Sequence, residues 1–261
     1  MIPLIKKVQR TLKIFIHGSF ANAKSWRKII ENLSGGDELI TINLPGHGGM
    51  PEPADFDQPT LNPEFDVIKD VIQKYEQKFD DIHLIGHSYG GVVALETALS
   101  LKFPIQKLTL FEPVYVSILK TYNHKMMQKV VNDFVIDYEE AALCGDKFAC
   151  AKVIDFWGGS GSFEVIPGHI KAQMTLMTKN NLRHWKICNS INRVADEYQN
   201  FDIPVSIIIG GKSNQVARKI AVTLNNHLPK STLDIIQEAS HFMITSHPAE
   251  CTAILTNKYT M

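Results

Sequence analysis

Short apolar runs alternate with longer stretches of helical periodicity along most of this chain, and this alternation limits the possible folds more than any other feature of the sequence. The runs are rich in β-branched residues and bounded by turn-forming residues, as expected for buried strands. The predicted strands are Leu12–Ile16, Leu39–Asn43, Ile82–Ile85, Leu108–Phe111, Val205–Ile209 and Leu233–Ile236. The predicted helices between them are Ser25–Leu33, Pro63–Lys78, Gly91–Leu101, Val216–His227 and Ala249–Asn257. The pattern predicts an α/β fold, with a mostly parallel twisted sheet, helices on both faces and a site at the C-terminal ends of the strands.

The alternation breaks between Pro113 and about Asn200, where the sequence offers no strong strand candidate. Tyr122–Tyr138, continuing through Glu139 and Glu140, and Pro167–Asn189 have the character of helices. We therefore expect residues 113–200 to form a helical cap, or lid, inserted into a core made of residues 1–112 and 201–261. The glycine-rich segment Phe156–Phe163 is interpreted as a turn between helices, with a mobile lid element as the alternative. A chain of 261 residues is long enough for one large α/β domain with such an insertion.

Composition excludes several classes of partner. The 27 Lys and Arg residues balance the 27 Asp and Glu residues, so no basic field is available for nucleic acid or for an anionic membrane. No apolar run approaches the ~18 residues of a membrane span, and the first ten residues lack the order of a signal peptide. We expect a cytoplasmic protein without stable membrane insertion, either a monomer or a homodimer. The four cysteines lack metal-binding spacing, so we expect reduced packing thiols.

The segment Gly86-His87-Ser88-Tyr89-Gly90-Gly91 carries the sharpest chemical signal. It follows a predicted strand and leads into a predicted helix, which is the context that a G-x-S-x-G nucleophile turn requires. Its glycines stand where the crowded backbone excludes side chains. Ser88 would lie at the helix N-terminus, where N–H groups favour developing negative charge. We predict Ser88 as a nucleophile.

A serine nucleophile needs a base and an oxyanion hole. His241 follows the last predicted strand, where a loop at the C-terminal edge of the sheet brings an imidazole toward Ser88, so we predict it as the base. The segment after the first strand holds Ser19 and Phe20, whose backbone N–H groups, Ser19 first, would complete an oxyanion hole with the N–H of Tyr89. His83, His124, His169, His184, His227 and His247 are interpreted as structural or solvated.

The chain resembles the α/β-hydrolase superfamily of lipases, esterases and C–C hydrolases. The resemblance rests on His17-Gly18, Asn43-Leu44-Pro45-Gly46-His47-Gly48, the Ser88 segment and Ser240-His241-Phe242, which follow the order of that superfamily. It implies a cap after the sixth core strand and no metal or organic cofactor.

The third member of the expected triad departs from the superfamily pattern. The superfamily usually carries an Asp shortly after the penultimate strand, but Ser213 stands at or near that position. Some members carry the acid after the preceding core strand, where this chain has Glu112. We therefore predict that Glu112 orients His241, with Ser213 or Asn214 as the fallback.

These residues predict a carboxylesterase-like serine hydrolase. It would act through an acyl-enzyme on a small or medium ester, thioester or related carbonyl compound, which is the expected small-molecule partner. Trp157 and Phe156 are predicted to contribute to its substrate pocket. Two alternatives remain: a ligand-binding protein of this fold with little or no catalysis, and a lyase or C–C bond hydrolase on the same triad.

Overall fold

The computed structural model describes residues 10–256, apart from residues 34, 76–77 and 101–102. Three features of the sequence prediction lie outside the described residues. One is the segment before Arg10, on which most of the argument about a signal peptide rests, and the other two are the predicted helix ends at Leu101 and Asn257. No helix in the described part of the chain is long and apolar enough to cross a membrane.

Six parallel strands form one sheet, which confirms the predicted α/β fold class. In spatial order the strands are β2 (Glu38–Ile42), β1 (Thr11–Ile16), β3 (Asp81–His87), β4 (Ile105–Phe111), β5 (Val205–Gly210) and β6 (Ser231–Ile236). Each strand overlaps one of the six predicted runs. Because the strands are parallel, their C-terminal ends lie along the same edge of the sheet, and the segments that follow β1, β3 and β4 become neighbours there.

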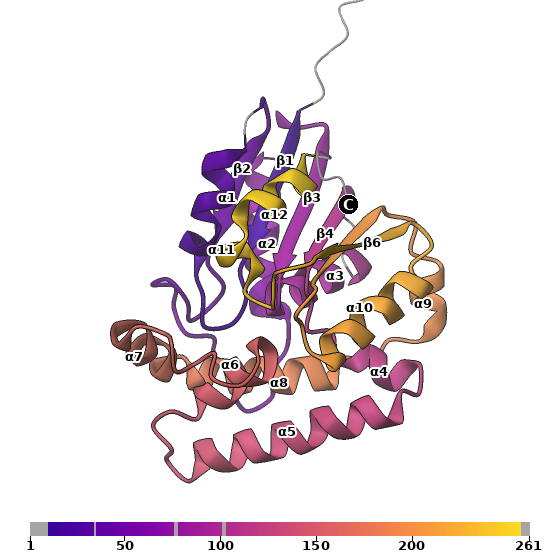
Figure 1. Cartoon of the computed structure of the whole chain (residues 1–261). Coiled ribbons are helices and arrows are strands. Elements are labelled where there is room, and N and C mark those ends of the chain that lie inside the picture. The colour runs from indigo at the N-terminus through magenta and orange to yellow at the C-terminus, as the bar shows by residue number, and fades with distance from the viewer. Residues whose placement is uncertain (1–9, 34, 76–77, 101–102, 257–261) are drawn as a thin grey trace, which may run out of the picture.

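Successive side chains of the strands point to opposite faces of the sheet and divide the core in two. Ile14 and Ile16 of β1 belong to one buried cluster, whereas Phe15 belongs to the other. Leu110 and Phe111 of β4 are divided in the same way. The first cluster includes side chains from α2 (Asn62–Tyr75), α3 (Tyr89–Ser100) and α10 (Gln215–His227). The second is covered by η1 (Ala23–Trp26), α1 (Arg27–Asn32), α11 (Met243–Ser246) and α12 (Pro248–Leu255), as Figure 1 shows.

The helices between the strands are present, but several ends differ from the prediction. The predicted helix Ser25–Leu33 consists of the short 3-10 helix η1 followed by α1. Helix α2 is described as far as Tyr75 and is followed by residues 76–77, which lie outside the described residues, whereas α3 begins at Tyr89, before the predicted Gly91. The earlier start of α3 places Ser88 directly at a helix N-terminus.

Six helices and no strand occupy the segment between β4 and β5. They are α4 (Ser117–Thr121), α5 (Lys125–Leu143), α6 (Cys150–Gly158), α7 (Gly168–Leu176), α8 (Thr178–Ser190) and α9 (Ala195–Gln199). Helices α5, α6, α7 and α8 lie beyond the C-terminal ends of the strands, at the bottom of Figure 1. The division of the chain into a core and a separate cap stays a prediction.

The sequence prediction for this segment was wrong in three details. The helix predicted from Tyr122 through Glu140 runs instead over Lys125–Leu143. The helix predicted at Pro167–Asn189 is interrupted at Met177, which separates α7 from α8. Phe156 and Trp157 belong to α6 rather than to a turn, because the helix continues to Gly158 and ends only where Gly159 adopts a φ of 98°.

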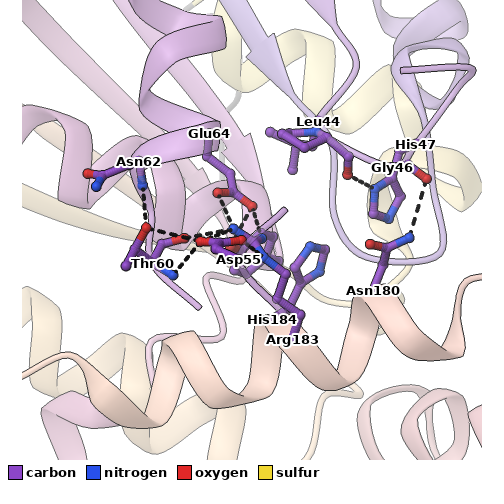
Figure 2. Close-up of polar contacts among 12 residues, drawn as sticks. Leu44, Gly46, His47, Asp55, Thr60, Asn62, Glu64, Asn180, Arg183 and His184 are labelled. Carbon is purple, nitrogen blue, oxygen red and sulfur yellow. Dashed lines mark hydrogen bonds and ion pairs between the residues drawn. The ribbon is translucent and has the colours of Figure 1, made fainter. Parts of the chain in front are cut away.

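Helix α8 is attached to the core by a buried arginine. Arg183 donates to Glu64 Oε1 at 2.5 Å and to Asp55 Oδ1 at 2.7 Å, and it also reaches the carbonyl oxygen of Thr60 at 2.8 Å (Figure 2). Arg183 and Glu64 are 1% and 0% exposed, so water screens this ion pair little. One turn earlier on the same helix, Asn180 points toward Gly46 (Figure 2). The position of α8 over the strand ends is thereby tied to the core.

Candidate active site

Ser88 lies in the tight turn between β3 and α3, with a φ of 56°. Its N–H donates to the carbonyl oxygen of Phe111 at 3.0 Å, so the turn is held by the neighbouring strand. The flanking glycines are needed because of close backbone contacts: a Cβ on Gly86 would lie 2.2 Å from the carbonyl oxygen of Gly90, and one on Gly90 would lie 2.3 Å from that of Ile16. The strained backbone at Ser88 therefore depends on flanking positions that only glycine can occupy.

His241 lies within hydrogen-bond distance of Ser88, with 3.0 Å between Nε2 and Oγ. It comes from the loop that follows β6, and its side chain is almost completely buried. Nε2 of His87 donates to the carbonyl oxygen of His241 at 2.7 Å, and the ring of Trp157 stacks near that of His241 at 5.4 Å between centroids. These contacts fix both the backbone and the ring of His241.

Glu112 accepts a hydrogen bond from the other ring nitrogen of His241, with 2.6 Å between Oε2 and Nδ1. It directly follows β4 and has a φ of 44°. Its Oε1 accepts from the N–H of Gly210 at 3.0 Å and from the hydroxyl of Ser213. Burial raises the pKa of Glu112, but the hydrogen bonds from His241, Ser213 and Gly210 outweigh burial and hold this pKa below its usual value. The carboxylate is therefore ionised at neutral pH, which favours a proton on Nδ1 of His241 and leaves Nε2 to accept from Ser88.

The segment after β1 lies directly against Ser88, because a Cβ on Gly18 would come within 2.8 Å of the Cβ of Ser88. In the described part of the chain, the backbone N–H groups of Ser19, Phe20 and Tyr89 donate to no protein acceptor. Phe20 has a φ of 57°, so the backbone turns sharply at this point. The three N–H groups are available to an oxygen atom bound beside Ser88.

Buried His17 anchors this segment. Its Nε2 accepts from the N–H of Leu44 at 3.0 Å, so the ring proton is on Nδ1, which donates to the carbonyl oxygen of Gly18 at 2.8 Å. Burial, with a smaller contribution from nearby His47, lowers the pKa of His17 to about 3. His17 is therefore a neutral structural group.

A cavity of about 540 Å³ opens beside Ser88 and His241. Many of the residues that line it come from the strand-end loops and from α6, α7 and α8, and none of the described lining residues is Asp, Glu, Lys or Arg. Ser19, Phe20 and Tyr89, which are predicted as oxyanion donors, and Trp157, which is predicted as a pocket residue, all line the cavity.

Phe156, which the sequence predicts as a pocket residue, is not among the residues that line this cavity. Its ring stacks on Phe134 of α5, with 4.0 Å between centroids. Neighbouring positions on a helix point about 100° apart, so only one of Phe156 and Trp157 faces Ser88.

His184, which the sequence analysis interprets as structural or solvated, is buried and also lines the cavity. The Nδ1 atom of His184, on α8, lies 2.7 Å from the hydroxyl oxygen of Ser19. His184 shares one helix face with Asn181, Trp185 and Cys188, and all four line the cavity. The i, i+3, i+4, i+7 spacing of these residues is a signal that could have identified this face in the sequence.

Among the described residues, no group of three or more His, Cys, Asp or Glu side chains is arranged to hold a metal ion. The site is built from a serine, a histidine, a glutamate and free backbone donors. A model of the alpha/beta hydrolase family matches residues 14–254 of the chain.

The chain belongs to the alpha/beta hydrolase family. The match extends from β1 to α12, so it includes Ser88, Glu112 and His241 together with all the helices between β4 and β5. The family assignment therefore covers the whole site.

Among curated proteins, this alpha/beta hydrolase is 25% identical to "Probable lysophospholipase BODYGUARD 2" from Arabidopsis thaliana, over 93% of the chain and 57% of that protein. It is 33% identical to "Putative esterase/lipase 2" from Mycoplasma genitalium, over 41% of the chain and 40% of that protein. The chain thus spans little more than half the length of the first relative and matches less than half of the second. The solved structure of MenH from S. aureus is similar in fold, with a TM-score of 0.74, 19% sequence identity, and coverage of 97% of this chain and 94% of that one.

Proposed function

We propose that the chain is a serine hydrolase of carboxylic esters or related acyl compounds, with Ser88 as nucleophile, His241 as general base and Glu112 as the acid that orients it. The observation that carries this proposal is the continuous chain of hydrogen bonds from Ser88 Oγ to His241 Nε2 at 3.0 Å and from His241 Nδ1 to Glu112 Oε2 at 2.6 Å. A serine hydroxyl becomes a competent nucleophile only when a positioned base takes its proton.

The proposed reaction has two halves. Ser88 Oγ attacks the substrate carbonyl carbon while His241 Nε2 takes the hydroxyl proton, and the carbonyl oxygen becomes a tetrahedral oxyanion. The free N–H groups of Ser19, or of Phe20, and of Tyr89 stabilise this oxyanion. His241 then gives its proton to the leaving oxygen or sulfur atom, the bond to the leaving group breaks, and an acyl-Ser88 ester remains.

Water completes the second half. His241 takes a proton from a water molecule as the water oxygen attacks the acyl carbon, and a second tetrahedral oxyanion forms. Its collapse breaks the bond to Ser88 Oγ, and Oγ recovers its proton from His241. Glu112 stays ionised throughout and stabilises the imidazolium that forms twice in each cycle.

The cavity supports an uncharged acyl group as the preferred substrate. Its wall contains no charged side chain among the described residues, and a charge buried there would lose hydration without gaining a partner. The printed names of the relatives, a probable lysophospholipase and a putative esterase/lipase, support carboxylic esters as the substrate class. Residues 113–200, whose helices α6, α7 and α8 contribute to the cavity wall, would act as the cap over the acyl group.

The experiment is steady-state hydrolysis of p-nitrophenyl esters of acetate, butyrate and octanoate by the wild-type protein and by Ser88→Ala and His241→Ala. The expected result is turnover by the wild type and a loss of about 10³-fold or more in kcat in each variant, to the background set by binding alone. Retention of the folded state by the variants is checked by circular dichroism. Equal rates in the wild type and Ser88→Ala would contradict the proposal, whereas tight binding of an acyl ligand without turnover would favour a binding protein of this fold.

A further inference from the structure

Ser19 lines the same cavity as Ser88, and its hydroxyl is held by another residue of the cavity wall. Ser19 follows β1, whereas its partner His184 is on α8, and 2.7 Å separate Ser19 Oγ from His184 Nδ1. His184 is only 2% exposed, and Ser19 is half-buried. The contact therefore joins the segment expected to supply an oxyanion donor to a helix of the insertion.

Burial keeps His184 neutral, so its ring carries a single N–H group. Removal from water lowers the pKa of His184 well below its usual value, and the neighbouring His47, Arg183 and His17 lower it further. The near-parallel rings of Tyr89, at 3.7 Å between centroids, and of His47, at 5.3 Å, flank the imidazole. The plane of the His184 ring is therefore fixed, and only the position of the proton remains to be assigned.

The second ring nitrogen of His184 determines that position. Nε2 is buried and has no hydrogen-bond partner among the described residues. A buried N–H without an acceptor loses a full hydrogen bond and is rare in proteins, whereas an unused lone pair is tolerated more often. The proton is therefore on Nδ1, and His184 donates to Ser19 Oγ. A hydroxyl that accepts through its oxygen keeps its own proton free to donate elsewhere.

We propose that the Ser19 hydroxyl donates this free proton in a hydrogen bond to the oxygen of the reacting carbonyl group at Ser88. The oxyanion would then have a side-chain donor in addition to the backbone N–H groups of Ser19 or Phe20 and of Tyr89. Ser19 is in this account a catalytic residue through its side chain, and His184 is a positioning residue. The proposal rests on the proposed hydrolase function, because it needs a carbonyl bound beside Ser88.

Two observations place the Ser19 hydroxyl close to the segments that carry the backbone N–H groups beside Ser88. The preceding residue, Gly18, lies so close to Ser88 that a Cβ on Gly18 would be 2.8 Å from the Cβ of Ser88. Tyr89, the residue that immediately follows Ser88, stacks on the imidazole that holds the Ser19 hydroxyl. The Ser19 hydroxyl is thus fixed relative to both segments from which the backbone N–H groups come.

The test combines Ser19→Ala, Ser19→Thr, His184→Phe and the double variant Ser19→Ala/His184→Phe in hydrolysis of p-nitrophenyl butyrate. Loss of one oxyanion donor costs about 10²- to 10³-fold in kcat, so with backbone donors still present we expect Ser19→Ala to lose about 10- to 100-fold in kcat with little change in KM. Ser19→Thr keeps a hydroxyl and should recover most of this loss. Phe keeps an aromatic ring between Tyr89 and His47 but cannot donate to Ser19.

The double variant tests the positioning role of His184. If His184 acts through Ser19, then Ser19→Ala should cost clearly less in the His184→Phe background than in the wild type, because the hydroxyl is already misdirected there. A trifluoromethyl ketone that forms an oxyanion on Ser88 gives an independent readout: its inhibition constant should rise by the same factor by which kcat falls in Ser19→Ala. A substitution that only perturbed the structure would not change kcat and the inhibition constant by the same factor.

Several outcomes would overturn the inference. A Ser19→Ala variant with kcat within about twofold of the wild type would show that the side chain donates nothing to the oxyanion. An equal loss of kcat on Ser19→Ala in the wild-type and His184→Phe backgrounds would show that His184 does not act through Ser19. Failure of the proposed function is distinguishable from both, since it would appear as wild-type turnover no faster than that of Ser88→Ala.

Discussion

Ser213 donates a hydrogen bond from its hydroxyl to Oε1 of Glu112, so the position at which the superfamily usually carries its acid contacts the residue that we propose as the acid in this chain. The other carboxylate oxygen of Glu112 faces His241. A serine at position 213 removes the like-charge repulsion that two acids would suffer there, and it adds a donor that favours the ionised form of Glu112. The serine at position 213 and the glutamate after β4 both depart from the superfamily pattern, and they belong to one hydrogen-bonded group.

Replacement of Glu112 tests its role as the orienting acid. Glu112→Gln keeps the size of the side chain but removes the charge that stabilises imidazolium, so kcat on p-nitrophenyl butyrate should fall by about 10³- to 10⁴-fold with KM little changed. Ser213→Ala removes only one donor to the same carboxylate and should cost no more than about tenfold. A Glu112→Gln variant with near-wild-type kcat would remove Glu112 from the proposed triad.

An acid placed at position 213 should replace Glu112 in part. Ser213→Asp in a Glu112→Ala background is expected to recover at least about tenfold in kcat over Glu112→Ala alone, because the new carboxylate lies beside the vacated site and restores a partner for His241. Ser213→Ala in the same background is the matched control and should recover nothing. Equal rates of the two double variants would show that position 213 cannot supply the acid.

The uncharged cavity predicts selectivity against charged acyl groups. We expect kcat/KM for the p-nitrophenyl ester of pentanoate to exceed that for p-nitrophenyl hydrogen succinate by at least about tenfold at pH 7.5, since an unpaired carboxylate in the cavity loses hydration. The two acyl chains are similar in length, so the comparison isolates charge. Comparable kcat/KM values would mean that the acyl group does not occupy the cavity beside Ser88.

Buried histidines should make the fold sensitive to mild acid. Burial lowers the pKa of both His17 and His87 to about 3, whereas histidine in an unfolded chain titrates near 6.5. Below pH 6.5 the unfolded state binds more protons than the folded state, so stability is lost as the pH falls from 6.5 toward 3. At pH 5 the two residues together should lower the free energy of unfolding by about 4 kcal/mol.

Urea denaturation at pH 7.5 and pH 5 measures this loss. His169→Gln provides a control, because His169 is exposed and its replacement should leave the pH dependence unchanged. An unchanged free energy of unfolding between the two pH values would contradict the account of His17 and His87 as buried neutral groups.

Removal of one partner of the buried ion pair between α8 and the core should destabilise the fold strongly. Arg183→Ala leaves Glu64 charged and buried, and should lower the free energy of unfolding by about 3–5 kcal/mol in urea denaturation. Lys152→Ala breaks an ion pair with Asp137 that is exposed to solvent, so it should cost no more than about 1 kcal/mol. Similar losses in the two variants would mean that burial of the Arg183 pair has no energetic consequence.

The sequence was most informative where a local pattern determined local structure. The six strands could be predicted because parallel strands covered on both faces are short continuous apolar runs, such as Val205–Ile209. The turn at Ser88 could be predicted because its glycines follow such a run. The position of His241 followed from the rule that the C-terminal ends of parallel strands meet at one edge. Glu112 was selected because of the resemblance to the superfamily, some members of which carry the acid after that strand. The catalytic roles of both residues stay predictions.

The parts that could not be predicted depend on contacts between distant segments. Ser19 and His184 are separated by 165 positions, and no local signal links them. The choice between Phe156 and Trp157 as a cavity residue depends on the rotation of α6, which its packing against α5 determines. Helix α8 similarly owes its position to Arg183 and its buried partner Glu64, which the periodicity of the sequence does not reveal.

The most direct test of the central claim is mass spectrometry of the protein after treatment with a fluorophosphonate, which reacts covalently with activated serines. The account predicts that the wild type gains one adduct, that fragmentation places it on Ser88, and that Ser88→Ala gains none. Labelling should slow markedly in His241→Ala, because the base that activates the hydroxyl is missing. A folded wild-type protein that remains unlabelled, or that carries the adduct on another residue, would contradict the assignment of Ser88 as the nucleophile.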